Sequence, residues 1–285
     1  MRPPPLPPCF CGWTMSDGYL VRGRFWAPPA GPPRGAVLYL HGIQSHGGWF
    51  AWSASLLAQH GCFVLLPDRR GSGMNPEARG DVSAADRWLA DIDELAAWVR
   101  QQTGLERLSL VAVSWGGKLA AAWAVRNPQR VGRLLLSTPG VFPAVDVRRA
   151  ERMRIAAALL LGGRGEFRIP LDDPERFTDN PDGQAFIRND PLKLTRATAR
   201  FLFHSARLER RLRRLPHGAL SPPMTLLLAG RDRIIANGPT EAWARRVSGG
   251  RARVICRPDQ AHTMEFARDT SAYEQVLVEW AVGAT

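Results

Sequence analysis

The sequence predicts an α/β protein in which a mostly parallel sheet carries helices on both faces, the doubly wound arrangement. Three observations indicate this class. Short, almost wholly apolar runs alternate with longer helix-like stretches along most of the chain. The 285 residues include 45% hydrophobic side chains, which is enough for a large buried core. One stretch, residues 141–221, breaks the alternation and contains no strand-like run.

Six apolar runs lack the polar alternation of half-exposed strands and are typical of strands in a parallel sheet. They span residues 36–40, 62–66, 108–113, 133–137, 224–229 and 252–256. Cys62 and Cys256 lie inside two of these runs, so we expect both thiols in the core. Cys9 and Cys11 have no second cysteine pair or histidine nearby, and we therefore expect reduced cysteines and no metal site.

Three stretches between these runs have helical patterns. Residues 85–102 place their apolar side chains on one face, which predicts an amphipathic helix. Residues 119–126 are rich in alanine and apolar on nearly every side, as in a helix buried against a sheet. Residues 271–282 predict a last helix. Strands and helices in this alternation indicate a doubly wound sheet.

The chain divides into a predicted core, residues 1–140 and 222–285, and a predicted helical cap or lid, residues 141–221. An insertion at the carboxyl end of a parallel sheet lies over the crevice where ligands bind. We interpret the apolar run 155–161 as a buried helix of this cap. A lid over an acyl pocket and a membrane-facing helix are the alternatives.

Residues 1–12 predict a Pro-rich, solvated tail of the polyproline type. Its prolines occupy the place where a secretory signal peptide would carry an apolar run. No segment of the chain has the ~18 consecutive apolar residues that cross a bilayer. We therefore expect no transmembrane segment and a cytoplasmic location.

The formal net charge is +12, from 38 Lys+Arg and 26 Asp+Glu, and all but Lys118 and Lys193 of the basic residues are arginines. Residues 141–221 hold 16 of the basic and 10 of the acidic residues, so half of the excess lies in the predicted cap. This concentration indicates an anionic substrate group or an acidic carrier protein at the cap, with a solvated helical surface as the alternative. No recognition motif accompanies the arginines, so nucleic acid is not an expected partner.

A nucleophile is predicted where the third core strand ends and a helix begins. Residues 112–117 read Ala-Val-Ser-Trp-Gly-Gly, the small-x-Ser-x-Gly pattern of a nucleophile elbow, with Ala112 in place of its first glycine. Small residues permit the sharp turn that leaves the hydroxyl of Ser114 exposed above the sheet. The alternative is an ordinary serine in a strand–helix turn.

A serine nucleophile needs a base, and the base needs an acid that holds its tautomer. His262 follows the last predicted strand and lies on a loop at the same edge of the sheet as Ser114. Asp232 directly follows the preceding strand. The order Ser114, Asp232, His262 is the one expected for a triad on a fold of this kind.

Acyl transfer also needs hydrogen-bond donors for the developing oxyanion. The first core strand ends in His41-Gly42-Ile43, and we expect the backbone N–H groups of Ile43 and Trp115 to be these donors. We interpret His41 as a residue that shapes the turn by hydrogen bonding, and not as the base.

These motifs together resemble the α/β-hydrolase superfamily, in particular its monoacylglycerol lipase and lysophospholipase branch (the serine aminopeptidase-type hydrolases). The matching segments are the opening hairpin around Asp17-Gly18, the H-G-x-x-x-H oxyanion loop at 41–46, the D-x-x-G-x-G loop at 68–73, the elbow, and the loops of Asp232 and His262. The resemblance implies catalytic roles for Ser114, Asp232 and His262, and substrate contacts at His41, Gly42, Gln44 and His46. Gln44 and Ser45 stand where the branch often has a glycine and a glutamate.

The leading hypothesis is a serine hydrolase that cleaves an ester or thioester of a small-molecule acyl substrate without a cofactor. An acyltransferase, a carrier-protein thioesterase, a peptidase or a C–C bond hydrolase would use the same triad. A non-catalytic binding module on a hydrolase fold is a more remote alternative, because such proteins usually lose a member of the triad.

Overall fold

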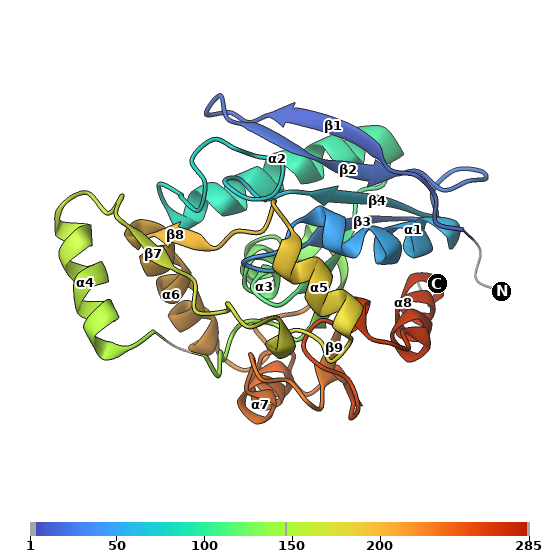
Figure 1. Cartoon of the computed structure of the whole chain (residues 1–285). Coiled ribbons are helices and arrows are strands. Elements are labelled where there is room, and N and C mark those ends of the chain that lie inside the picture. Colours follow the sequence, from blue (N-terminus) through green and yellow to red (C-terminus); the bar gives the residue numbers. More distant parts are fainter. Residues whose placement is uncertain (1–3, 146, 284–285) are drawn as a thin grey trace.

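The computed structural model describes residues 4–145 and 147–283, and an eight-stranded sheet crosses its centre (Figure 1). The strand order is β1-β2-β4-β3-β5-β6-β9-β10. All pairs from β4 to β10 are parallel, whereas β1 and β2 form an antiparallel hairpin at one edge. The strands are β1 (Cys9–Thr14), β2 (Leu20–Trp26), β3 (Gly35–Leu40), β4 (Cys62–Pro67), β5 (Leu108–Val113), β6 (Val131–Ser137), β9 (Met224–Ala229) and β10 (Arg253–Arg257). The six predicted core strands and the mostly parallel α/β class are confirmed.

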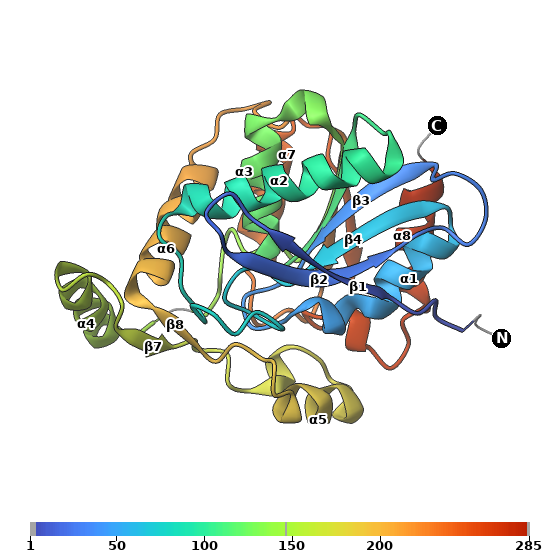
Figure 2. The ribbon, with the colours of Figure 1, turned by 90° about the horizontal axis from the view of Figure 1, so that it is seen from above.

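Helices cover both faces of the sheet (Figure 2). One face carries α1 (Ala51–Gln59) and α8 (Ser271–Val282), which pack together, and the other carries α2 (Ala85–Thr103) and α3 (Gly116–Arg126). A further helix, α7 (Asn237–Val247), packs against β9. The three helices expected from the apolar patterns are α2, α3 and α8. Within the described residues, no helix has the length and apolar character needed to cross a membrane.

The register of the parallel strands brings the loops that follow them to one edge of the sheet. Leu40 of β3 lies opposite Ala112 of β5, and Val113 of β5 lies opposite Ser137 of β6. Ser137 in turn lies opposite Leu227 of β9. Because the strands point the same way, the turns after β3, β5, β9 and β10 are neighbours in space although they are far apart in sequence.

The predicted cap region, between β6 and β9, lies over this edge (Figures 1 and 2). Its elements are α4 (Arg149–Leu160), β7 (Glu166–Arg168), η3 (Pro174–Arg176), α5 (Pro181–Asn189), β8 (Arg196–Thr198) and α6 (Ala199–Arg213). The expectation that this region holds no strand was wrong, because β7 and β8 pair as a short antiparallel ladder. Three residues are too few to produce a recognisable strand pattern.

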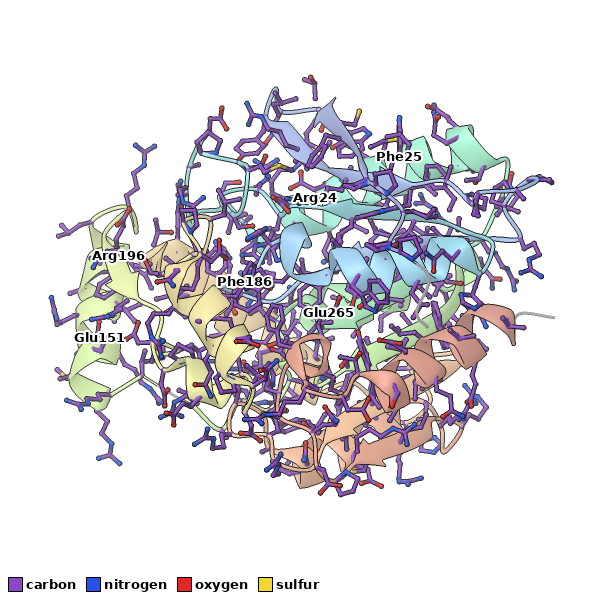
Figure 3. The ribbon with its side chains drawn as sticks, turned by 45° about the vertical axis from the view of Figure 1, so that its right-hand side comes forward. Arg24, Phe25, Glu151, Phe186, Arg196 and Glu265 are labelled. Atoms are coloured by element: carbon purple, nitrogen blue, oxygen red, sulfur yellow. The ribbon has the colours of Figure 1, made fainter. Side chains whose placement is uncertain are left out.

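Aromatic packing attaches the cap region to the core. Phe186 of α5 points toward the core elements beneath it (Figure 3). The centroid of its ring lies 6.2 Å from that of Trp49, in η1 (Gly47–Phe50). It lies 5.4 Å from the ring centroid of Phe266, in η4 (Met264–Phe266). Trp49 and Phe266 also contact each other, so the three rings form one cluster beside the loop of His262.

The interpretation of residues 155–161 as a buried helix was wrong. They belong to α4 and its C-terminal end, where no described side chain is buried, and Leu160 and Leu161 are 89% and 87% exposed. Helix α4 contacts α6 but otherwise projects from the molecule (Figure 1), and its residue Glu151 is labelled in Figure 3. An apolar run by itself does not reveal whether a second layer covers it.

Two smaller expectations also needed correction. Residues 9–12 of the predicted solvated tail form the start of β1, because their backbone pairs with β2; residues 1–3 of the tail lie outside the described residues. Cys62 is buried as expected, but Cys256 is exposed, because β10 is the edge strand of the sheet and has one face toward solvent.

Glu265 of η4 is a partly buried residue whose carboxyl lies against Ser53 of α1 (Figure 3). Its side chain accepts a hydrogen bond from the Ser53 backbone at 3.0 Å and contacts the Ser53 hydroxyl. The hydroxyls of Tyr39 and Tyr273 lie next to this pair. Burial, with a smaller contribution from the charge of Glu274, raises the pKa of Glu265 to about 8.

The raised pKa predicts a stability that depends on pH. The folded state holds the Glu265 proton more tightly than the unfolded chain does, so this contribution is complete below the ordinary pKa of 4.5 and is lost as the pH rises through about 8. Glu265→Gln, which cannot ionise, should therefore gain stability relative to the native protein as the pH rises through this range. Thermal melts at several pH values test this, with the exposed Glu279→Gln as control. Parallel pH curves for Glu265→Gln and the native protein would contradict it.

Candidate active site

The turn between β5 and α3 holds Ser114 in a left-handed conformation, with φ of 53°. Its backbone N–H donates to Ser137 of β6 at 3.0 Å, and its carbonyl accepts from Gly140 at 2.7 Å. A Cβ at Gly116 would overlap the Leu40 carbonyl oxygen and lie 2.6 Å from that of His41. The turn is therefore as tight as the small-residue pattern predicts, and positive φ at a non-glycine residue is typical of a functional site.

His262 and Asp232 meet at the same edge of the sheet. Nδ1 of His262 lies 2.8 Å from Oδ2 of Asp232, and both side chains are almost wholly buried. The other oxygen of Asp232 accepts from the backbone N–H groups of Ile234 and Ile235 at 2.8 and 2.9 Å, which fixes the carboxylate. Nε2 of His262 is buried and has no hydrogen-bond partner within the described part of the chain.

Ser114 and His262 line one small pocket with a cavity volume of about 10 Å³. The oxyanion loop forms another wall of it: a Cβ added to Gly42 would lie only 3.8 Å from Oγ of Ser114. Ile43 lines the pocket beside them. The structure thus brings the three predicted triad residues and the first predicted oxyanion residue to one place, and Trp115 directly follows Ser114.

Arg69 holds the oxyanion loop from behind. Its guanidinium donates to the carbonyl oxygens of Gly42 and Ile43, both at 3.0 Å. The guanidinium also lies over the ring of Trp115, with Cζ 4.5 Å from the ring centroid. The Gly42 carbonyl and the Ile43 N–H belong to one trans peptide and point in opposite directions. Arg69 therefore aims the Ile43 N–H away from itself. Burial lowers the pKa of Arg69 to about 9, so its charge is retained at neutral pH.

His41 shapes this loop, as expected. Its Nε2 accepts from the Arg69 backbone at 2.9 Å, so the proton resides on Nδ1, which donates to the Gly42 carbonyl at 2.9 Å. Burial and then the charge of Arg69 lower the pKa of His41 well below its ordinary value of 6.5. Both ring nitrogens are engaged within the loop.

His46 is also bound within the fold. Nδ1 accepts from the Gly48 backbone at 3.0 Å, and Nε2 donates to Asp190 of the cap region at 3.1 Å. Asp190 accepts from Trp49 Nε1 as well, at 2.7 Å. His46 therefore ties the cap region to the oxyanion loop, and neither of its ring nitrogens is available to a ligand in this conformation.

Gln44 and Ser45 differ from these histidines. Both side chains are buried in the wall of the small pocket, at 1% and 4% exposure. Neither the amide of Gln44 nor the hydroxyl of Ser45 has a hydrogen-bond partner among the described residues. Buried polar groups without partners are costly, and they mark a place where a ligand can satisfy them.

A second, larger pocket, with a cavity volume of about 160 Å³, is also lined by Ser114, and His262 is not among its lining residues. Its walls come from the loop after β6, from the cap region and from the loop of Asp232, and they are mostly apolar. The lining includes Ile43, Trp115, Pro143, Val145, Val147, Ile169, Pro170, Leu171, Ile234 and Ile235. Lys118 and Ser205 are polar exceptions in this wall.

Arg69, Asp190 and Lys118 were not predicted as site residues from the sequence. Arg69 lies inside the D-x-x-G-x-G loop, and Lys118 lies four residues after Ser114, so each was close to a recognised motif. Their sequence positions indicate that they lie near the site. They do not indicate that Arg69 donates to backbone carbonyl oxygens or that Lys118 lines a pocket. Asp190 lies in the cap region, where no motif marked it.

A doubly wound sheet with a serine elbow and a paired histidine at its carboxyl edge defines an α/β-hydrolase. Residues 31–269 match the family described as serine aminopeptidase, S33. The chain belongs to this family, within the monoacylglycerol lipase and lysophospholipase branch of the α/β-hydrolases. It is an enzyme of the α/β-hydrolase class.

Curated relatives and solved structures agree with this placement. Phospholipase YtpA of Bacillus subtilis is 23% identical over 78% of this chain and 85% of its own length. The monoacylglycerol lipase of Mycolicibacterium smegmatis is 24% identical over 90% and 91%. The uncharacterized protein YnbC of Escherichia coli is 28% identical, and the match spans only 40% of its length. The Saccharomyces cerevisiae monoglyceride lipase structure shares the fold, with a TM-score of 0.87 and 16% identity over 98% of this chain and 96% of that one.

The crowding at Gly116 predicts that even a methyl group there destabilises the elbow. Gly116→Ala would force α3 away from the backbone of β3, at a cost of about 1–3 kcal/mol in the free energy of unfolding. Gly238→Ala in α7 is the matched control, because its Cβ would meet nothing within 4 Å. Urea unfolding measures both variants. Equal free energies for the two would show that the elbow is not crowded.

Proposed function

We propose that the protein hydrolyses carboxylic esters or thioesters through an acyl-enzyme on Ser114. The observation that carries this proposal is the 2.8 Å pairing of His262 with Asp232. It leaves Nε2 of the imidazole without a partner in the wall of a pocket that Ser114 also lines. A neutral imidazole held in this tautomer is a suitable base for a serine hydroxyl.

In the first half-reaction, Oγ of Ser114 attacks the carbonyl carbon while Nε2 of His262 accepts the hydroxyl proton. Asp232 stabilises the resulting imidazolium through Nδ1–H. The backbone N–H groups of Ile43 and Trp115 bind the oxyanion. As the bond to the leaving oxygen or sulfur breaks, His262 returns the proton to the leaving alcohol or thiol.

The second half-reaction repeats these roles with water as the nucleophile. His262 accepts a proton from the water molecule as its oxygen attacks the acyl carbon, and the oxyanion again binds to the same two N–H groups. Collapse of this intermediate breaks the bond to Ser114, whose Oγ takes the proton back from His262. The products are the carboxylic acid and the free enzyme.

The position of His262 indicates which part of the substrate lies in each pocket. The leaving group must be within reach of Nε2 of His262, so it lies on the side of the small pocket, where the polar atoms of Gln44 and Ser45 lack partners among the described residues. This supports the predicted substrate contact of Gln44 and favours a leaving alcohol with hydroxyl groups. The acyl group then extends into the larger, apolar pocket. His41 and His46 position the loop instead of binding substrate.

The alternatives with the same triad differ in the acceptor of the acyl group or in the bond that breaks. The acidic carrier protein expected at the arginine-rich cap stays a prediction without a supporting contact. The names of the B. subtilis and M. smegmatis relatives support a lipid-like ester instead.

Ser114 and Asp232 variants test the mechanism. Ser114→Ala should abolish hydrolysis of short and medium p-nitrophenyl esters and labelling by a fluorophosphonate probe. Asp232→Asn should lower kcat by about 10⁴, because its amide would donate to Nδ1 and impose the wrong tautomer. Its remaining oxygen can still accept from Ile234 and Ile235, so the loop should persist.

Ser221→Ala is the control for these variants, because Ser221 is an exposed serine before β9. It should retain both hydrolysis and labelling. Full activity of Ser114→Ala on the same esters would exclude the acyl-enzyme mechanism.

Arg69 should support the oxyanion donors without touching substrate. Arg69→Met removes the bonds to the Gly42 and Ile43 carbonyls, and we expect kcat to fall about 10- to 100-fold with little change in KM. Affinity for a trifluoromethyl ketone, which forms a tetrahedral adduct, should fall by a similar factor. Arg69→Lys should recover part of the loss.

Arg79→Met is the matched control for Arg69→Met. Arg79 also donates to backbone carbonyls, those of Gly73 and Leu192, but contacts neither Gly42 nor Ile43. A rise in KM at unchanged kcat in Arg69→Met, or an equal loss in the control, would rule out the positioning role.

A further inference from the structure

The larger pocket contains a buried positive charge that ester hydrolysis does not require. Lys118 of α3 is 5% exposed and lines the pocket next to Ser114. Its ammonium lies 2.7 Å from Oε2 of Glu209 and 3.4 Å from the hydroxyl of Ser205, both on α6. Helices α3 and α6 pack side by side, so the charge lies between core and cap region (Figure 1).

The cluster has more positive than negative charge. Glu209 is shared, because its other oxygen lies 2.6 Å from Nη2 of Arg213. The Arg213 side chain is 38% exposed, so water screens its charge, whereas Lys118 is buried. Burial lowers the pKa of Lys118, and the charge of Glu209 only partly offsets this. Because Glu209 is shared with Arg213, an anion beside the ammonium would complete the compensation of the Lys118 charge.

The ammonium also has capacity to bind one more group. It carries three N–H donors, of which Glu209 takes one and the Ser205 hydroxyl can take a second. The Ser205 oxygen is already engaged, because it accepts from Nε1 of Trp115 at 2.8 Å. The third donor of Lys118 is therefore available to a ligand in the pocket.

The pocket itself relates the two residues. Ser114 precedes α3 and Lys118 lies in its first turn, and both line the larger pocket. The pocket between them is otherwise apolar, with Pro143, Ile169 and Ile235 in its walls. A short methylene chain fits these walls, with the ester carbonyl at Ser114 and a charged end at Lys118.

We propose that Lys118 binds a carboxylate at the far end of a short acyl group, so that the substrate is a monoester or monothioester of a dicarboxylic acid. This rests on the proposed function, because it requires the acyl group to lie in the larger pocket. Hydrolysis breaks the ester bond as described above and releases the dicarboxylate and the alcohol or thiol. Lys118 takes no part in proton transfer.

The test compares two esters of similar length, p-nitrophenyl butyrate and mono-p-nitrophenyl glutarate, which differ in the terminal carboxylate. The measured quantity is the ratio of kcat/KM for the anionic ester to that for the neutral ester. Lys118→Met should lower this ratio by about tenfold or more, the usual effect of losing a charged hydrogen bond. Lys118→Arg should retain part of the preference.

Glu209→Gln supplies a prediction of the opposite sign. It removes the competing carboxylate but keeps the shape of the side chain, so the ratio should rise. A purely structural ion pair would be broken by either variant and would give no opposite shifts. Equal or absent shifts in Lys118→Met and Glu209→Gln would overturn the proposal. If Lys118→Met does not fold, Glu209→Gln decides alone, and an unchanged or lower ratio overturns the proposal.

Arg253 and Glu279 form the matched control, an exposed ion pair at 3.0 Å between β10 and α8. Arg253→Met and Glu279→Gln should leave the ratio unchanged. Failure of this proposal is separable from failure of the proposed function. The neutral ester could be hydrolysed in a reaction that requires Ser114 while the kcat/KM ratio is unchanged by Lys118→Met and Glu209→Gln. That result would refute only the dicarboxylate substrate.

A binding measurement gives a readout that does not depend on turnover. In the Ser114→Ala background, glutarate should raise the melting temperature, and Lys118→Met should remove this shift. Butyrate, which has a single carboxylate and should bind more weakly, is the comparison ligand. Equal stabilisation by glutarate with and without Lys118 would contradict the site.

Discussion

The left-handed turn at Ser114 is the constraint on which the rest of the site depends. A positive φ at a serine costs about 1–3 kcal/mol, which the surrounding structure must offset. Hydrogen bonds to Ser137 and Gly140 on the neighbouring segment do so, and the missing side chain at Gly116 lets α3 approach the end of β3. The position of the hydroxyl at the carboxyl edge therefore depends on the register of the central parallel strands.

Two buried positive charges, those of Arg69 and Lys118, lie near the segments that form the site. Arg69 has backbone carbonyls as its hydrogen-bond acceptors, so its charge is not neutralised by a directly bonded carboxylate. Lys118 shares one carboxylate with Arg213. In a low-dielectric interior such charges act strongly on nearby groups. One lies behind the proposed oxyanion donors and the other in the wall of the acyl pocket, so both favour negative charge near Ser114.

The cap region contributes to the site through its contacts with the core. Asp190 accepts from His46 and Trp49, and Ser205 accepts from Trp115, so two elements of the cap region hold the two sides of the proposed oxyanion site. The basic residues of this region serve different purposes. Arg213 pairs with Glu209 beside the pocket, whereas the exposed side chains of α4 face outward, away from it.

The sequence by itself determined the sheet, its main helices and the order of Ser114, Asp232 and His262, because each depends on a local pattern: an apolar run, a helical spacing or a turn motif. It could not show that α4 is uncovered or that Cys256 is exposed, since both depend on what packs alongside. The partners of Arg69 and Lys118 likewise come from segments distant in sequence. Only the tertiary structure decided these points, because burial and hydrogen bonding between remote segments leave no periodic trace in the chain.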